Sequence, residues 1–246
     1  MVVVLGRPGV LVDGVVVHPA RRRVRLLLGL LAVRADRALS SEWLIDALWP
    51  GRPPVSAAAN VRSHLAELRR VLRAADPDGP GIVASGDGYV LVSGVDGVDV
   101  TRFRRLKSEG RTLRCAGAYG AAARCLTDAV DLWRGPVMSG VPVPDAVRAD
   151  VTVLDEQRVD AWEELMDVRL ALGAHQDLVP VLAGLVVEHP LRERLWCQLV
   201  TALCGAGRRS EAVAVYQRLV RVLDTELGVE PCPESRALYE AIRGRA

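Results

Sequence analysis

A spacing of 34 residues recurs through the second half of the chain. The residues that repeat at this spacing are aromatic, aliphatic or glycine, and the pairs are Trp162 with Trp196, Leu165 with Leu199, Gly173 with Gly207, Val179 with Val213, Leu182 with Tyr216, Leu185 with Leu219, and Val186 with Val220. A period of this length is typical of a unit of two antiparallel helices that buries its apolar face against the next unit. The spacing therefore predicts an all-α stack with a groove for partners.

The repeated units are predicted at residues 159–190 and 193–223, with a related but diverged helix pair at 101–133 and a capping helix at 234–243. Tryptophan, leucine and small residues at these places resemble the tetratricopeptide pattern. The repeat predicts a scaffold and no particular chemistry. Its large aromatic side chains are interpreted as core and not as a ligand cage: Trp133, Trp162, Trp196, Tyr216 and Tyr239.

Charge is distributed unevenly although the chain of 246 residues carries a net charge of only +2. Residues 1–75 hold 12 arginines and five acidic residues, a net charge of +7. Residues 76–99 hold five aspartates and no basic residue, and residues 100–246 are balanced. A basic block of this kind is the footprint expected for nucleic acid. An ordinary solvated surface remains the alternative.

The basic block is predicted to be α+β. Short β-branched runs at residues 2–5, 10–12 and 15–17, with an Asp13-Gly14 turn, predict a small antiparallel sheet. Apolar spacing predicts a helix from Arg21, and a serine can cap each of the next two helices. The predicted caps are Ser40 or Ser41 for the second helix and Ser56 for the third, which runs to about Arg73; a β-hairpin follows at residues 82–92.

The third helix has three distinct sides. At about 100° per residue its apolar positions form one stripe that must be buried: Val61, Leu65, Leu68 and Leu72. The opposite side is polar and presents Ser56, Asn60, Ser63, Glu67 and Arg70, and a flank carries Arg62, Arg69 and Arg73. A helix that reads DNA needs short polar groups for base edges and arginines for phosphates. An amphipathic surface helix shows the same periodicity.

Three strings identify the first block as similar to a known domain. These are LSSEWLIDALWP, NVRSHLAELRRVLR and GDGYVL, and together they resemble the OmpR-type winged-helix DNA-binding domain, with its four-stranded opening sheet. The resemblance implies that the third helix enters the major groove and that the hairpin, or wing, reaches the backbone or minor groove. It places Ser63 and Glu67 at base-facing positions and Arg69 at a phosphate. Glu67 departs from the arginine common in relatives; it could accept from cytosine N4 or pair with Arg62 or Arg70.

The predicted DNA contacts lie on the third helix, on the loop before it and on the hairpin. His64 could donate to DNA, and a partly buried structural histidine is an equal alternative. The full set is Arg52, Ser56, Asn60, Arg62, Ser63, His64, Glu67, Arg69, Arg70, Arg73, Ser85, Gly88 and Tyr89.

The second block resembles the bacterial transcriptional activation domain in the strings VDVTRFRRLKSEGR, LWRGP, EHPLRERLWCQLVTAL, AGRRSEAVAVYQR and LGVEPCPESRALYEAI. We therefore predict two domains, an α+β winged helix at 1–98 and tetratricopeptide-like helical repeats at 99–246. This pairing resembles the Streptomyces antibiotic regulatory protein family. The resemblance implies an activator of an antibiotic gene cluster that binds promoter direct repeats of double-stranded DNA as a homodimer and contacts RNA polymerase or its sigma factor.

Signals for other classes of protein are missing from the sequence. It contains no phosphate-binding glycine loop, no H-E-x-x-H and no G-x-S-x-G, and its five cysteines form no C-x-x-C pair. We therefore predict no enzyme activity, no cofactor and no metal. With no signal peptide and no membrane-spanning run, we predict a cytoplasmic protein. The alternative function is a repeat scaffold that acts through protein–protein contacts only.

Overall fold

The computed structural model describes residues 1–244 and contains two compact units. The first unit comprises Met1–Ser108 and Asp128–Val159, and the second comprises Glu109–Thr127 and the chain from Asp160 onward. The division into residues 1–98 and 99–246 follows sequence motifs and stays a prediction. Three helices contribute residues to both units: α4 (Asp99–Cys115), α5 (Tyr119–Val130) and α6 (Asp145–Ala171).

The first unit begins with a three-stranded antiparallel sheet in the order β1 (Val2–Val3), β2 (Gly9–Val12) and β3 (Val15–Val17). The register places Val12 opposite Val15, so the connection is the two-residue turn Asp13–Gly14. Both turn residues have positive φ, 48° and 80°. This conformation matches the right-handed twist of the flanking strands. The predicted D-G turn is confirmed.

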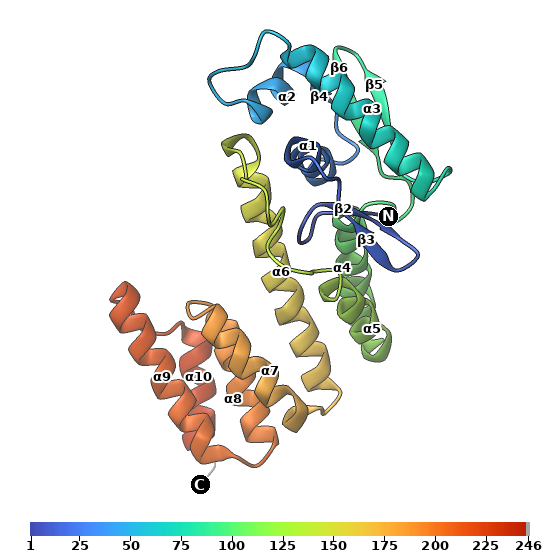
Figure 1. The fold of residues 1–246 in the computed structure, drawn as a ribbon. Helices are drawn as coiled ribbons and strands as arrows, with labels where there is room; N and C mark the ends of the chain where they lie inside the picture. The colour runs from blue at the N-terminus through green and yellow to red at the C-terminus, as the bar shows by residue number, and fades with distance from the viewer. Residues whose placement is uncertain (245–246) are drawn as a thin grey trace. The chain divides into compact units, whose positions relative to one another are not determined.

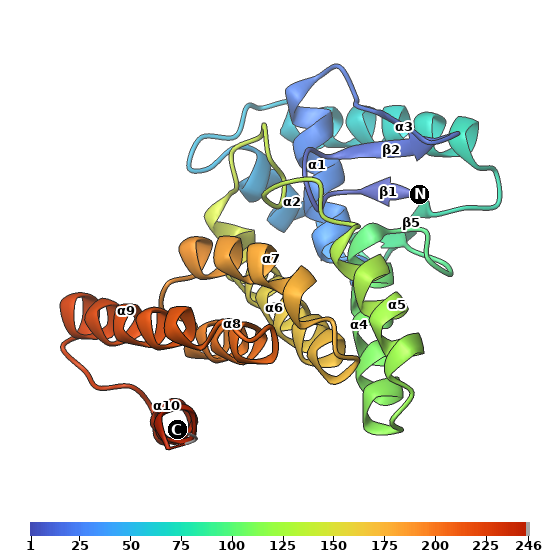
Figure 2. The same ribbon diagram turned by 90° about the horizontal axis from the view of Figure 1, so that it is seen from below.

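Three helices pack on one another beside this sheet: α1 (Arg22–Val33), α2 (Ser41–Leu48) and α3 (Ala57–Ala75). Figure 1 shows α1 end-on between α3 and β2, and the turned view in Figure 2 shows α3 running along β2. Ser40 caps α2, because its side-chain oxygen accepts a hydrogen bond from the backbone N–H of Trp43 at 3.1 Å. The prediction that Ser56 caps α3 is wrong, although Ser56 does occupy the N-cap position. Ser56 precedes α3 but makes no capping hydrogen bond, and its Oγ accepts from Asn60 instead.

A second sheet has the order β4 (Leu39–Ser40), β6 (Gly88–Val92) and β5 (Gly81–Ser85). The predicted four-stranded opening sheet is therefore wrong: the strand before α2 pairs with the hairpin and not with β1–β3. The hairpin turn is also one residue earlier than the D-G signal suggests. Ser85 pairs with Gly88, so the loop is Gly86–Asp87, with Gly86 at φ 57°.

A buried carboxylate joins distant segments of the first unit. Asp99, at the start of α4, is fully buried, and its oxygens accept from the backbone N–H of Val4 at 2.9 and 3.0 Å and of Leu5 at 3.0 Å. Arg134, which follows α5, donates to the same carboxylate at 2.8 Å. Burial raises the pKa of Asp99 to about 6, because desolvation outweighs these hydrogen bonds and the nearby positive charge. One side chain thus holds the end of β1, the start of α4 and the loop after α5.

The second unit is helical and follows the predicted repeat. Its further helices are α7 (His175–Glu188), α8 (Glu193–Gly205), α9 (Arg209–Leu227) and α10 (Pro233–Arg243). Helix α8 packs against α7, α9 and α10. Gly173 and Gly207 occupy the two helix–helix turns in the left-handed conformation, with φ of 81° and 76°. The 34-residue offset is therefore seen in the backbone conformation as well as in the sequence.

Candidate nucleic-acid interface

Helix α3 is fixed by its apolar stripe. Val61, Leu65, Leu68 and Leu72 are all at most 3% exposed, as the periodicity predicts. Burying four such side chains contributes about 1.5–3 kcal/mol each relative to exposure. The rotation of α3 about its axis is therefore set by packing, and the residues on the opposite side necessarily face outward.

The outward side of α3 is basic. We define the α3 ridge as the exposed residues Arg62, Ser63, Ala66, Arg70 and Arg73. Within residues 1–244 its three arginine side chains form no ion pair and no hydrogen bond. Ala66 lies between them and has only a methyl group, so a flat surface can approach the helix closely. The ridge can therefore bind an extended anion, with the Ser63 hydroxyl near its N-terminal end.

Glu67 lies at the edge of this ridge and is half-buried. Its carboxylate pairs with Arg21, with 3.4 Å between Oε2 and Nη1. The expected alternative partners, Arg62 and Arg70, are thus wrong: the cation comes from the segment that precedes α1. Asn60 is half-buried too, and its Nδ2 donates to Ser56 Oγ at 3.2 Å.

The hairpin is attached to α3 through Arg69. Its Nε donates to the carbonyl oxygen of Ile82 at 2.9 Å, and its guanidinium lies 5.7 Å from the centre of the Tyr89 ring. Because Nε is already used, only the terminal nitrogens of the Arg69 guanidinium are left to donate to a phosphate. Gly88 is buried, and a Cβ at this position would lie 1.9 Å from the carbonyl oxygen of Leu39. Gly88 is therefore a packing residue that lets β6 approach β4.

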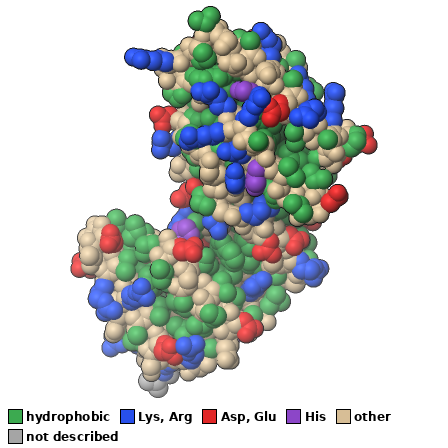
Figure 3. Space-filling model, viewed as in Figure 1, with side chains coloured by type: hydrophobic (Ala, Val, Ile, Leu, Met, Phe, Trp, Pro, Cys, Tyr) green, Lys and Arg blue, Asp and Glu red, His purple; other side chains and the backbone are tan. Residues whose placement is uncertain are grey.

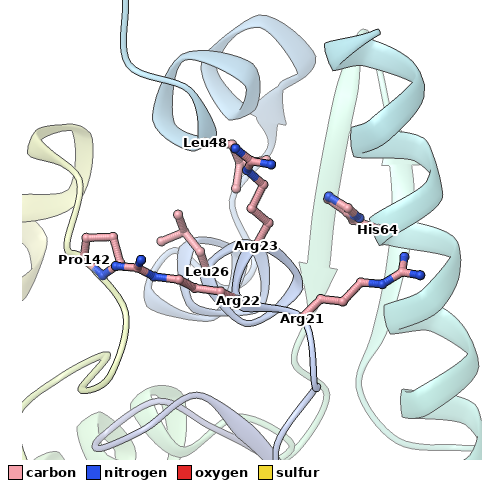
Figure 4. Close-up of a pocket in the computed structure, with 7 residues that line it drawn as sticks. All are labelled: Arg21, Arg22, Arg23, Leu26, Leu48, His64 and Pro142. Carbon is pink, nitrogen blue, oxygen red and sulfur yellow. The ribbon is translucent and has the colours of Figure 1, made fainter. Parts of the chain in front are cut away.

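His64 faces the start of α1 and not the ridge. Its Nδ1 is buried without a hydrogen-bond partner among the described residues. Burial lowers the pKa of His64 and the charges of Arg21 and Arg23 lower it further, against an opposing effect from Glu67. Figure 4 shows His64 beside Arg21 in a pocket that also holds Arg22 and Arg23. These three arginines are not among the predicted site residues, although their run of consecutive charge is visible in the sequence.

The predicted contact residues thus fall into three groups. Those on the open surface are Arg52, Ser56, Arg62, Ser63, Arg70 and Arg73. Six of them are half-buried: Asn60, His64, Glu67, Arg69, Ser85 and Tyr89. Gly88 is buried. Figure 3 shows blue arginine side chains gathered over the part of the chain that contains α1 to α3.

The described residues lack the features of two other kinds of site. Residues 1–244 contain no helix that is both long and apolar enough to cross a membrane. In the same range, no group of three or more His, Cys, Asp or Glu side chains is placed to hold a metal ion. The α3 ridge consists of three arginines, one serine and one alanine.

Comparison with known families gives a match over most of the chain. Residues 98–243 match the bacterial transcriptional activator domain. This range begins one residue before α4 and ends at the last residue of α10.

Proteins with similar sequences are named as regulatory proteins. The regulatory protein DnrI of Streptomyces peucetius is 34% identical over 236 residues, which is 94% of this chain and 87% of DnrI. The regulatory protein AfsR of Streptomyces coelicolor is 38% identical, but the chain spans only 23% of its length. A solved structure of Mycobacterium tuberculosis EmbR with a low-affinity phosphopeptide superposes with a TM-score of 0.89 at 33% identity, over 98% of this chain and 64% of EmbR. The chain therefore belongs to the family of transcriptional regulators that carry a bacterial transcriptional activator domain.

Proposed function

We propose that the chain is a sequence-specific, DNA-binding transcriptional activator with no enzymatic activity. In this proposal residues 1–98 form an OmpR-type winged helix, with α3 as the recognition helix and the β5–β6 hairpin as the wing. The observation that carries the proposal is the α3 ridge. Three arginines without acidic partners share the exposed side of α3 with Ser63, and the opposite face of the helix is fixed in the core.

The ridge residues divide by chemistry. A serine hydroxyl can donate to or accept from a base edge, and the small Ala66 leaves room for α3 to enter the major groove. Arg62, Arg70 and Arg73 supply charge for the phosphates that border the groove. Glu67 can accept from cytosine N4 only if its carboxylate is shared with Arg21 or released from it.

The wing contact is supported by the same geometry. Arg69 joins α3 to Ile82 of β5, and Ser41 Oγ donates to the carbonyl oxygen of Asp87 at 2.6 Å, so the hairpin is held at both ends. A rigid hairpin beside α3 can place Ser85 near the DNA backbone. The residues of the wing and of α3 then act as one surface.

The second block is proposed to provide activation. Its match to the bacterial transcriptional activator domain and the similarity to two Streptomyces regulators support an assignment to the Streptomyces antibiotic regulatory protein family. We propose binding to promoter direct repeats as a homodimer, contact with RNA polymerase or its sigma factor, and an antibiotic biosynthetic gene cluster as the target.

The test is DNA binding by fluorescence anisotropy with the full chain, using promoter fragments of a neighbouring gene cluster and random DNA at two salt concentrations. Affinity should fall steeply with salt, by a slope of about 0.9 per phosphate contacted. Arg62→Ala and Arg70→Ala should weaken binding to all sequences and lower that slope by about 1 for each phosphate that is no longer bound. Ser63→Ala should change the preference at particular base pairs.

Arg221→Ala is the matched control, because Arg221 is an exposed arginine on α9 with no ion pair or hydrogen bond in the described chain. Its affinity and salt slope should equal those of the wild type. If no promoter fragment binds more tightly than random DNA, the activator proposal fails and the protein-only scaffold is favoured. If Arg221→Ala weakens binding as much as Arg62→Ala, the ridge is not the binding surface.

A further inference from the structure

Three consecutive arginines meet at the start of α1 and point to different walls of one pocket. Figure 4 shows Arg21 directed toward α3, Arg22 toward Pro142, and Arg23 toward Leu48. Arg21 is paired with Glu67, while Arg22 and Arg23 have no acidic partner among the described residues. Arg23 stacks on Trp49 at 5.1 Å, which restrains its guanidinium. The rim of the pocket therefore holds more positive than negative charge.

The floor of the pocket is apolar. Leu26 lies between Arg22 and Arg23, Leu48 lies near the end of Arg23, and Pro142 closes the side reached by Arg22; both leucines are about nine-tenths buried or more. The hollow has a volume of about 560 Å³. Sites for small organic molecules occupy about 300–1,000 Å³, with mostly apolar linings and a few polar groups. The size and the lining both fit a small molecule better than a bare inorganic ion.

One polar atom at this pocket lacks a partner. The Nδ1 atom of His64 is buried and makes no hydrogen bond within residues 1–244. This atom has less than 1 Å² of exposed surface, so a ligand in the hollow contacts the edge of the imidazole and reaches Nδ1 only if the ring turns.

We propose that the pocket lined by Arg21, Arg22, Arg23, Leu26, Leu48, His64 and Pro142 binds a small organic anion, with an apolar body on the leucine floor and a carboxylate, phosphate or sulfonate head on the arginine rim. Guanidinium groups bind such heads through paired N–H donors. The apolar floor distinguishes such a ligand from the DNA backbone as the occupant of the pocket. The DNA backbone offers phosphates but has no apolar group that would fill the hollow.

The ligand would act on α3 through Arg21, and this step rests on the proposed DNA-binding function. Arg21 now neutralises Glu67 at the edge of the α3 ridge. An anion that takes the Arg21 guanidinium leaves the Glu67 carboxylate unpaired beside the DNA phosphates. Like charges repel, so the bound anion should lower DNA affinity. The pocket is therefore assigned a regulatory role that opposes DNA binding.

The first arm of the test needs no DNA. The full chain is titrated with 1-anilinonaphthalene-8-sulfonate, followed by its fluorescence, and the dye is displaced with octanoate, octyl phosphate or inorganic phosphate. Arg22→Gln combined with Arg23→Gln should weaken dye and octanoate binding by about tenfold or more, the equivalent of removing one charge-assisted hydrogen bond. Pro142→Trp keeps the charges but fills the hollow, and should weaken binding similarly. Arg221→Gln, on the exposed side of α9, should not change it.

The second arm adds a promoter duplex. Octanoate should raise the dissociation constant for DNA in the wild type and in Arg221→Gln, and should have no effect in the double arginine variant. Thermal unfolding by circular dichroism confirms that each variant is folded; if the double variant is not, Pro142→Trp alone decides the dye arm.

Three results would overturn the proposal. Dye affinity that is equal in the wild type and in both pocket variants excludes an anion site here. Displacement by inorganic phosphate as effective as by octanoate excludes an organic ligand. If a random duplex displaces the dye and octanoate does not, the three arginines bind DNA phosphates and not an organic anion. If no DNA binding occurs at all, the dye arm still decides the pocket, so the two proposals fail separately.

Discussion

Removing the Asp99 carboxylate tests the buried junction of the first unit. In Asp99→Ala the backbone N–H groups of Val4 and Leu5 lose their acceptors, and Arg134 loses its partner. Each buried N–H left without a partner costs about 1–3 kcal/mol. The guanidinium of Arg134 is 35% exposed and regains water, so its release adds little. We expect a total loss of about 3–5 kcal/mol, a large share of a stability of about 5–15 kcal/mol.

The assay is urea denaturation of the full chain at pH 7, followed by circular dichroism, with Arg221→Ala as a surface control. Asp99→Ala should lower the midpoint strongly, and Arg134→Ala should lower it less, because the backbone donors to Asp99 remain. A loss below about 1 kcal/mol for Asp99→Ala, within the range of an ordinary surface substitution, would refute the view that this carboxylate organises the junction.

The pH dependence of the same site has a definite sign. The pKa of Asp99 is about 6 in the folded chain against an ordinary value of 3.8. The folded state then binds the proton more tightly than the unfolded state, so stability falls as pH rises from about 4 to about 6 and is level above. The difference in stability between the wild type and Asp99→Asn, which cannot titrate, should fall by about 3 kcal/mol over that range. A difference that rises with pH would show that the hydrogen bonds outweigh desolvation.

Three further predictions concern the helices and sheet around α3. Ser40→Ala should lower stability by about 1 kcal/mol in thermal denaturation, since it removes the α2 cap on Trp43. Gly88→Ala should cost about 1–3 kcal/mol or more in urea, because its Cβ would clash with the carbonyl oxygen of Leu39; loss of β4–β6 amide protection in hydrogen exchange is the accompanying sign. The lowered pKa of His64 predicts that the wild type loses stability relative to His64→Gln as pH falls below about 6.5, and equal pH profiles would contradict it.

Periodic features could be predicted from sequence because they depend on local geometry. The apolar stripe of α3 is buried as expected, since residues three and four apart share a helix face. The 34-residue spacing places Gly173 and Gly207 at equivalent turns, where positive φ favours glycine. The Asp13–Gly14 turn follows from the same local rule. These predictions needed no knowledge of which segments meet in space.

Partners that are distant in sequence could not be predicted. Glu67 has Arg70 three residues later on its own helix, at a spacing that favours an ion pair, yet it pairs with Arg21 because the packing of α1 on α3 brings that side chain closer. The short strand before α2 was not predicted, because its pairing partner is also distant in sequence. Its backbone groups bond wherever an unpaired edge lies, and the edge that reaches Leu39 belongs to β6.

The position of Asp99 explains why motif boundaries and packing boundaries differ in this chain. The match to the activator domain begins at residue 98, and the acidic segment ends one residue later, at Asp99. A buried carboxylate nevertheless requires donors, and these come from Val4 and Leu5 on one side of the boundary and from Arg134 on the other. The side chain of Met138 also packs closely against Gly29 of α1. A Cβ added at Gly29 would lie only 2.6 Å from the Cε atom of Met138. The core that supports α3 therefore includes residues of the activator domain, so substitutions at residues 128–159 should affect the α3 surface even though they lie outside the motifs that identify it.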